Sequence, residues 1–373
     1  MTPVADVACA AASAVPAAQR IAAIEAARRQ CLLKGATSGA PTSIEPWILA
    51  SWQRCLASGR HPRERVVFDT VSAAAVRRAL DASRALREAA APVIARTLDR
   101  AMADTGYFAL LTDAHGVVVD VLGPVDRHDP HARAIARVGV DLSEAAVGTT
   151  AIGAALAERI PVWLHRGEHF FDDTAVYSCA GAPVFGPDGC CLGMLDLTGV
   201  HSPERRALRH LVSVTVRRIE AALVLRQPHA LTLRLTWPGQ LPGDDNDGLL
   251  TLNADGRVVG GNRGAADMLD LRPATQGWPH ADDLFAVPVG ELFDAARHGR
   301  GPRELPTWAG LRVQVLASLP DADRPDGSTA LPLKERETAL IRQAVAQAGG
   351  NVAEAARRLG ISRATVYRKL AQR

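Results

Sequence analysis

Near its C-terminus the chain reads Asn351-Val-Ala-Glu-Ala-Ala-Arg-Arg-Leu-Gly-Ile-Ser-Arg-Ala-Thr-Val-Tyr-Arg-Lys-Leu370, which predicts two short helices joined by a tight turn. Asn351 is expected to cap the first helix, and Gly360 to supply the turn. Ser362 is expected to cap the second helix, on which Val366 and Leu370 face inward, four residues apart. A short helix that exposes arginine, threonine and lysine can enter the major groove of DNA. The sequence therefore predicts a helix-turn-helix, and a capped helical hairpin with a solvated basic face is the alternative.

The DNA contacts are expected on the outward face of the second helix and at the two caps. An arginine such as Arg363 would read a guanine, while the other basic side chains would contact phosphates. The predicted DNA-binding residues are Asn351, Ser362, Arg363, Ala364, Thr365, Tyr367, Arg368 and Lys369.

Charge is distributed unevenly along the 373 residues, whose formal net charge is +3. Residues 331–373 hold nine basic and three acidic side chains, a formal charge of +6, so the rest of the chain sums to −3. This is the pattern expected of a small nucleic-acid-binding module attached to a neutral or acidic body.

Length and composition indicate ordinary folded domains. The chain is long enough for two or three domains, and it is 47% hydrophobic and 22% charged. No run approaches the roughly 20 apolar residues that a membrane helix needs. The N-terminus also lacks the basic segment and long apolar run of a signal peptide. We therefore expect a cytoplasmic protein with no membrane partner.

Three segments share one form, in which an apolar run, a turn with glycine and a second apolar run follow each other. The glycine supplies the positive φ that a tight hairpin needs, and β-branched residues fill the strands. Hairpins interleaved with helices favour an α+β fold with antiparallel sheets. The segments are Phe108–Asp120, Ala182–Asp196 and Leu249–Val259.

Helices and linkers are predicted around these hairpins. Pro92 is the expected kink or break in its helix. Ser202 is the expected cap of the helix that runs to Arg226. The apolar stripe of this helix predicts packing in the core, with a dimer-forming helix as the alternative. The helices are expected at Ala17–Leu33, Ile44–Ala57, Val71–Met102 and Ser202–Arg226, and the linkers at Gln227–Asn246 and Asp321–Thr329.

The chain also has cysteines and one string that resembles a metal site. The six cysteines form no C-x-x-C pair and are expected to be reduced thiols, with redox sensing at Cys179 as the alternative. His165-Arg-Gly-Glu-His169 matches the H-x-x-E-H pattern of some zinc proteases. That chemistry needs both histidines on one face of a helix, whereas a strand-like run precedes them and Gly167 lies between them. We therefore predict no catalytic residue, no metal and no cofactor.

Two family resemblances follow from these motifs. The segment from Asn351 to Leu370 resembles the Fis-type helix-turn-helix, which implies a module that works as a dimer on paired half-sites. The runs Ser51–Cys55, Gly139–Glu144, Gly148–Leu156 and Gly193–Gly199 resemble the N-terminal region of acetoin-catabolism (AcoR-like) regulators. That resemblance covers about Ile44 to Leu225 and implies a GAF domain that senses a small molecule. Leu249 to Leu271 resembles a PAS-like domain, and this likeness continues loosely to Val315.

The resemblance implies an α+β fold with a GAF-like sensor domain, a degenerate PAS-like domain and a C-terminal all-α helix-turn-helix. The expected boundaries are 1–70 for an N-terminal helical region, 71–226 for the GAF-like domain, 245–318 for the PAS-like domain and 331–373 for the helix-turn-helix. Each candidate for the sensor pocket has ordinary core packing as its alternative. The candidates are Tyr107, Trp163, Phe170, Cys179 and Met194.

The sequence departs from most such regulators in one respect, the sigma-54-activating ATPase. That ATPase needs a P-loop lysine, and none of the three lysines (Lys34, Lys334 and Lys369) lies in such a motif. We therefore expect a transcription regulator, not an enzyme, that responds to a small effector and lacks this ATPase. Its expected partners are double-stranded DNA, the effector, a second copy, and RNA polymerase or a full-length relative. The alternative is a ligand-independent interaction protein that partners or antagonises a full-length AcoR-like activator.

Overall fold

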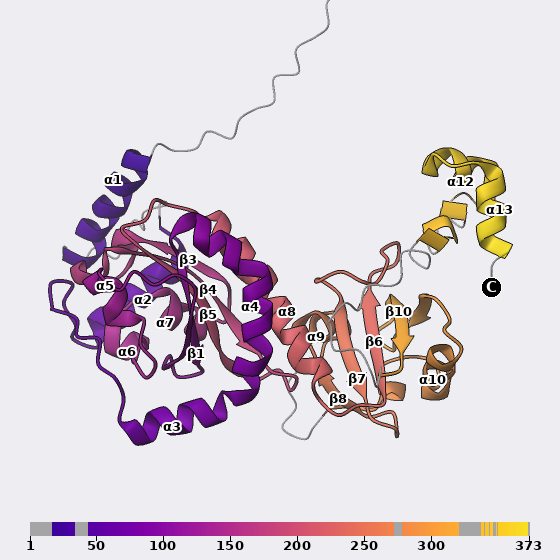
Figure 1. Ribbon diagram of the computed structural model, residues 1–373, viewed down its shortest axis with the longest axis horizontal. Coiled ribbons are helices and arrows are strands. Elements are labelled where there is room, and N and C mark those ends of the chain that lie inside the picture. The colour runs from indigo at the N-terminus through magenta and orange to yellow at the C-terminus, as the bar shows by residue number, and fades with distance from the viewer. Residues whose placement is uncertain are drawn as a thin grey trace, which may run out of the picture.

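The computed structural model describes residues 17–33, 44–271 and 278–320, and residues 337–371 except 339, 343, 346, 347 and 349. Two five-stranded antiparallel sheets and a small helical module follow one another along the chain (Figure 1). This mixed architecture confirms the predicted α+β fold. The linker expected at 321–329 lies outside the described residues.

The first sheet has the strand order β2-β1-β5-β4-β3, and all its neighbouring strands are antiparallel. The first two predicted hairpins are confirmed as β1–β2 and β4–β5. At Gly193 a Cβ would lie 1.9 Å from the Thr112 carbonyl oxygen, so only glycine fits between β5 and β1. The strands are β1 (Phe108–Asp113), β2 (Val118–Leu122), β3 (Val162–His165), β4 (Tyr177–Phe185) and β5 (Cys191–Val200).

Alternation along the strands gives the first sheet two buried faces. Tyr107, Ala109 and Leu111 pack in a cluster with α4 (Arg84–Thr105) and α8 (Ala207–Leu225). Phe108 and Leu110 point the other way, into a cluster that belongs to the opposite face. That face is covered by α1 (Ala17–Arg28), α2 (Pro46–Ala57), α5 (Pro130–Ile135), α6 (Glu144–Val147) and α7 (Ala151–Glu158).

The N-terminal helices belong to the core of the first sheet. Ile24 of α1 and Ile48 and Trp52 of α2 are almost fully buried in the cluster that contains Phe108 and Leu110. The region predicted as a separate unit therefore packs together with the sheet that follows it.

Two predicted helix boundaries differ in the structure. Pro92 lies inside α4 and does not break the helix, so the break predicted there is wrong; it comes at Ser83, between α3 (Ala73–Ala82) and α4. The buried side chains of α4 outweigh the cost of an internal proline, about 3 kcal/mol. Helix α8 begins at Ala207 and not at Ser202. The Ser202 hydroxyl donates to the Val200 carbonyl oxygen at 3.2 Å, and the Trp163 indole donates to the Glu204 carboxylate at 3.3 Å. The apolar stripe of α8 packs in the core, as predicted.

The second sheet has the order β8-β7-β6-β10-β9. The third hairpin predicted along the chain is confirmed as β7–β8 of this sheet. The linker predicted at Gln227–Asn246 is wrong, because the central strand of this sheet, β6 (Leu231–Thr236), lies inside it. Leu231, Leu233 and Leu235 point into the core of this sheet. The other elements are β7 (Gly248–Leu252), β8 (Val258–Gly261), α9 (Arg263–Leu269), α10 (Val289–Arg297), β9 (Arg303–Pro306) and β10 (Arg312–Ser318).

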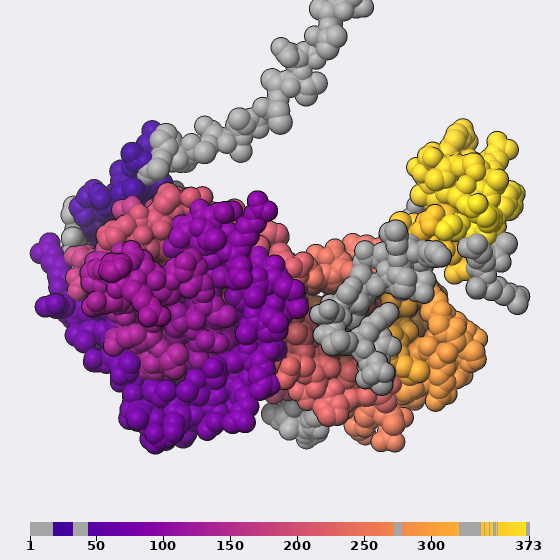
Figure 2. Space-filling model, in the orientation of Figure 1, coloured from indigo at the N-terminus to yellow at the C-terminus, as the bar shows by residue number. Residues whose placement is uncertain are grey.

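The C-terminal module is helical, and in Figure 2 it forms a body of its own at one end of the molecule (yellow). Its elements include α12 (Val352–Leu359) and α13 (Arg363–Ala371). Ile341, Ala356 and Val366 are buried at its centre. Gly360 has a φ of 65°, a left-handed conformation that favours glycine at the end of α12.

Within the described parts of the chain, no helix is both long and apolar enough to cross a membrane. All five cysteines found there are free thiols (Cys31, Cys55, Cys179, Cys190 and Cys191).

Candidate functional site

A cavity of about 30 Å³ lies on the face of the first sheet that α2 and α7 cover, between the strands and the covering elements. One water needs roughly 10–15 Å³ on the same scale, so this volume holds about two waters. Most of the wall is apolar, and a few polar groups are grouped on one side, as is typical of sites for small molecules. The lining residues are Phe68, Leu110, Ile135, Leu142, Thr150, Ala151, Ile152, His169, Thr174, Tyr177, Cys179, Asp196 and Thr198.

Asp196 supplies a buried carboxyl group in the middle of β5. The Thr198 hydroxyl donates to its Oδ2, whereas Oδ1 is buried and has no hydrogen-bond partner among the described residues. Burial raises the pKa of this carboxyl from 3.8 to about 7, because the charged form is poorly solvated. Asp196 is therefore able to accept or to donate a hydrogen bond near neutral pH.

His169 supplies the second polar group of the cavity. Its Nδ1 lies 2.9 Å from the carbonyl oxygen of Arg166, and because a carbonyl only accepts, Nδ1 carries the proton. Burial lowers the pKa of the ring to about 4, so the imidazole is neutral at pH 7. Its Nε2 then has a free lone pair, and it is buried without a partner among the described residues. The cavity thus presents a hydrogen-bond acceptor at His169.

Cys179 lies beside this polar pair on the neighbouring strand. Its Sγ is 3.5 Å from the Thr198 hydroxyl. Burial raises the pKa of the thiol well above its usual value, and the Asp196 carboxylate acts in the same direction. The thiol is therefore protonated and a poor nucleophile, which fits a wall residue better than a redox sensor.

The structure brings only some of the predicted pocket residues to the cavity. Cys179 lines it, and Phe170 and Met194 are buried on the same side of the sheet. Tyr107 and Trp163 lie on the opposite face, in the cluster with α4 and α8. The sequence shows which residues are apolar or aromatic, but strand register decides which face each of them occupies.

Sequence reasoning missed the two polar groups of the cavity. Asp196 ends the second predicted hairpin segment and is not among the predicted site residues, but it lies within β5, opposite Gly181 and Leu110. The available signal was its position two residues before Thr198 in an otherwise apolar strand, which places both side chains on one face. His169 had been considered only as part of the H-x-x-E-H string.

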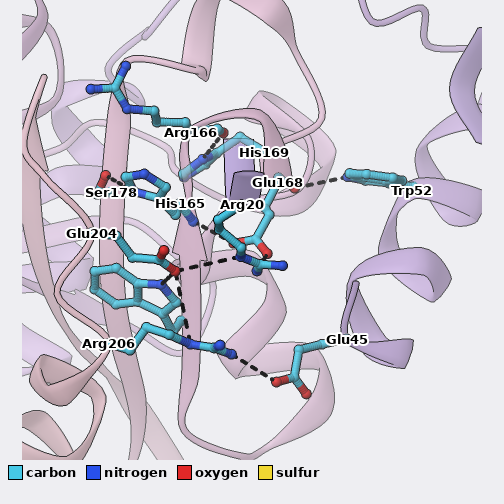
Figure 3. Close-up of polar contacts among 11 residues, drawn as sticks. Arg20, Glu45, Trp52, His165, Arg166, Glu168, His169, Ser178, Glu204 and Arg206 are labelled. Atoms are coloured by element: carbon cyan, nitrogen blue, oxygen red, sulfur yellow. Dashed lines mark hydrogen bonds and ion pairs between the residues drawn. The ribbon is translucent and has the colours of Figure 1, made fainter. Parts of the chain in front are cut away.

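That string forms a network of protein contacts (Figure 3). His165 ends β3, and Arg166 to Glu168 form a short 3-10 helix. The Glu168 carboxylate accepts from the His165 backbone N–H at 2.7 Å and pairs with Arg20 of α1. The Nδ1 of His165 lies 2.8 Å from the Ser178 hydroxyl. The residues that the structure describes contain no group of three or more side chains able to hold a metal ion.

The C-terminal module presents a second candidate site on α13. Arg363, Ala364, Tyr367 and Arg368 are exposed, whereas Thr365 is half-buried. The remaining predicted contacts serve the module itself. Asn351 caps α12 by accepting from the backbone N–H groups of Ala353 and Glu354, Ser362 accepts from the backbone N–H of Thr365, and Lys369 pairs with Glu337 at 2.5 Å.

Residues 20–217, more than half of the chain, match the family profile described as "MimR, N-terminal domain". The chain belongs to this family. Residues 332–372 match a second profile, "Bacterial regulatory protein, Fis family". The predicted AcoR-like and Fis-type resemblances are thereby confirmed.

Named relatives agree with these matches. The chain is 33% identical over 174 residues to the acetoin catabolism regulatory protein of Cupriavidus necator, a match that covers 45% of this chain and 26% of that protein. It is 33% identical over 176 residues to the propane 2-monooxygenase operon transcriptional activator MimR of Mycolicibacterium goodii, covering 46% of this chain and 28% of that protein. The match therefore spans under a third of the length of either relative.

Among solved structures, the chain is similar to the crystal structure of the E. coli DhaR(N)–DhaL complex. That similarity has a TM-score of 0.45 and 14% identity, and it covers 74% of this chain and 99% of the other.

The MimR N-terminal domain match includes every residue that lines the cavity, and it begins within α1. The cavity, the 3-10 segment and α1 thus belong to one family domain.

Proposed function

We propose that this chain is a DNA-binding transcription regulator in which the MimR N-terminal domain binds a small neutral effector and the C-terminal module binds the operator. The observation that carries the proposal is the cavity with two buried polar atoms that lack partners, Asp196 Oδ1 and His169 Nε2. An unpaired buried polar group costs roughly 1–3 kcal/mol, so a ligand that pairs with both is favoured.

The chemistry of the two atoms describes this effector. Since His169 Nε2 accepts, the ligand must donate, as a hydroxyl group does. Asp196 can donate to a carbonyl oxygen when protonated or accept from a second hydroxyl when ionised. A C. necator relative is named for acetoin catabolism, and acetoin carries one hydroxyl and one carbonyl group. Acetoin is therefore the first effector to test, and a molecule of its size binds only if the cavity, which holds about two waters, widens.

His169→Phe is expected to weaken acetoin binding by at least about tenfold, because the acceptor is lost and the larger ring enters the cavity. The binding constant would be measured by titration calorimetry on the full chain. Tyr107→Phe, which removes one hydroxyl on the opposite face, is the matched control and should bind acetoin as the wild type does. Equal loss in both variants would contradict the placement of the effector.

For the operator, we infer that Arg363 reads a base, because it is exposed at the start of α13 and forms no ion pair among the described residues. Arg363→Ala is expected to cost roughly 1–3 kcal/mol at one base position. Gel-shift titrations on single-base operator variants would measure this loss. Arg357→Ala on α12 removes the same charge and is the control. Wild-type specificity in the Arg363 variant would exclude it as a base reader.

We further propose that the chain acts as a homodimer on half-sites about one helical turn, near 34 Å, apart. Without a P-loop lysine it would act by occluding DNA or by contacting RNA polymerase. The domains we propose are those predicted at 71–226, 245–318 and 331–373, with the second extended back to include β6. The alternative function, a partner or antagonist of a full-length relative, predicts mixed dimers and no response to acetoin.

A further inference from the structure

We propose that the N-terminal segment Ala17–Leu33 is part of the effector site, and that Arg28 is the positioning residue through which it acts. Arg28 would hold the wall segment 166–172, which carries His169, in the geometry that binds the ligand. This inference rests on the proposed effector site and assigns it a further component.

One guanidinium group holds this wall segment on both sides of His169. Arg28 Nη1 donates to the carbonyl oxygen of Gly167 at 2.9 Å and to that of His169. Nη2 donates to the carbonyl oxygen of Phe170 at 3.0 Å and to the Asp172 carboxylate at 2.5 Å. The planar fork of arginine suits this geometry, whereas a lysine ammonium lacks it. The backbone around the cavity histidine therefore depends on a side chain from the N-terminal segment.

The wall segment and α1 also approach each other closely. A Cβ at Gly167 would lie 3.0 Å from Arg28 Cδ and 3.1 Å from Ile24 Cγ2, so a larger residue would fit only if these side chains shifted by a few tenths of an ångström. Ile24 is 1% exposed and belongs to the core cluster that surrounds the cavity. This close packing is a second observation, independent of the hydrogen bonds of Arg28.

Glu168 provides a third connection, which Figure 3 shows. Its buried carboxylate pairs with Arg20 of α1, and its carbonyl oxygen accepts from the Trp52 indole at 3.0 Å. The H-x-x-E-H string thus acts as the attachment point of the N-terminal helices. Few regular backbone hydrogen bonds hold a short 3-10 turn, so side chains from α1 and α2 determine its position.

The consequence for binding follows from the place of His169. His169 lines the cavity and its Nε2 is buried without a partner among the described residues, while its carbonyl oxygen and those of its neighbours are bound by Arg28. If Arg28 is removed, these carbonyls must find other partners, and the wall moves. A ligand that needs Nε2 at a fixed place then loses affinity.

The test compares Arg28→Ala with Arg29→Ala in the full chain. Arg29 is the neighbouring residue, is 62% exposed and pairs only weakly with Glu25 on the same helix, at 4.0 Å, so it controls for the lost charge. Two quantities would be measured: hydrogen exchange of amides 166–172 without ligand, and the binding constant of acetoin. Exchange of the β1 amides would report whether each variant keeps its fold.

Arg28→Ala is expected to raise exchange in 166–172 but not in β1, and to weaken acetoin binding at least about tenfold. Arg29→Ala should change neither quantity, and Arg28→Lys should be intermediate. Wild-type exchange and affinity in Arg28→Ala would overturn the proposal. If the wild-type chain binds no acetoin, the proposed effector is wrong. Hydrogen exchange of amides 166–172 then tests the role of Arg28 by itself, and an unchanged exchange rate in Arg28→Ala overturns that role.

Discussion

Asp196→Asn is expected to stabilise the ligand-free chain by about 4 kcal/mol at pH 8 and by less than about 1 kcal/mol at pH 4. The reason is that burial raises the pKa of Asp196 from 3.8 to about 7 in the folded protein. Between these two values the folded state binds more protons than the unfolded state. Stability is therefore greatest below pH 4 for this group and is lost as the pH rises through 7. An uncharged amide does not have this penalty.

The free energy of unfolding would be measured with urea at pH 4 and pH 8. Glu168 and Glu220, whose pKa values burial also raises to about 7, act in the same direction, so the difference between variant and wild type isolates Asp196. Asp188→Asn, in the exposed turn between β4 and β5, is the matched control and should show no such difference. A stabilisation that is the same at both pH values would contradict the raised pKa of Asp196.

The same variant should still bind acetoin, because an amide N–H₂ can donate to the carbonyl oxygen of the ligand as the protonated carboxyl does. An amide has a fixed acceptor and a fixed donor, whereas the carboxyl group adapts to either kind of ligand atom. Thr198 would occupy the acceptor, which leaves the amide N–H₂ facing the cavity. The result would be a more stable chain that still binds acetoin, and loss of binding in this variant would show that Asp196 must accept from the ligand and not donate to it.

Val366→Asp is expected to abolish operator binding while the two sheets remain folded. Val366 is fully buried, and Ile341 and Ala356 are the other buried residues that its cluster holds among those described. A carboxylate placed there has no partner and costs several kcal/mol. A module of about 40 residues has little stability of its own. We therefore expect it to unfold as a unit.

Gel shifts on the operator would measure the loss, and limited proteolysis of the full chain would locate the unfolded part. Leu340→Asp is the matched control, because Leu340 lies in the same module but is 48% exposed. It should keep both the fold and most of the DNA affinity. Operator binding by Val366→Asp at wild-type strength would show that the helical core does not support the DNA-binding surface.

Short-range signals explain which parts of the fold were predictable. The three hairpins each carry a glycine turn between apolar runs, and all three are found. In the C-terminal module, Asn351, Gly360 and Ser362 cap or end the helices as expected, since each acts on backbone groups within a few residues. Such features depend on local chemistry, which a single sequence displays.

Longer-range competition explains the errors. Ser202 has the chemistry of a cap, but Glu204 is engaged by Trp163 from a distant strand, and α8 starts later. The β6 strand was taken for a linker because prolines and glycines flank it, although its alternating leucines fill the core of the second sheet. Tyr107 and Trp163 were expected at the pocket, whereas strand register turns both to the other face.

By itself, the sequence determined the α+β class, the hairpins and the helix-turn-helix, because turns, caps and periodicity act between near neighbours. Only the tertiary structure decided that Asp196 and His169 share one cavity and that Arg28 holds its wall. Those groups come from separate segments of the chain. Their unpaired atoms and shifted pKa values arise from burial, which exists only once the segments have packed together.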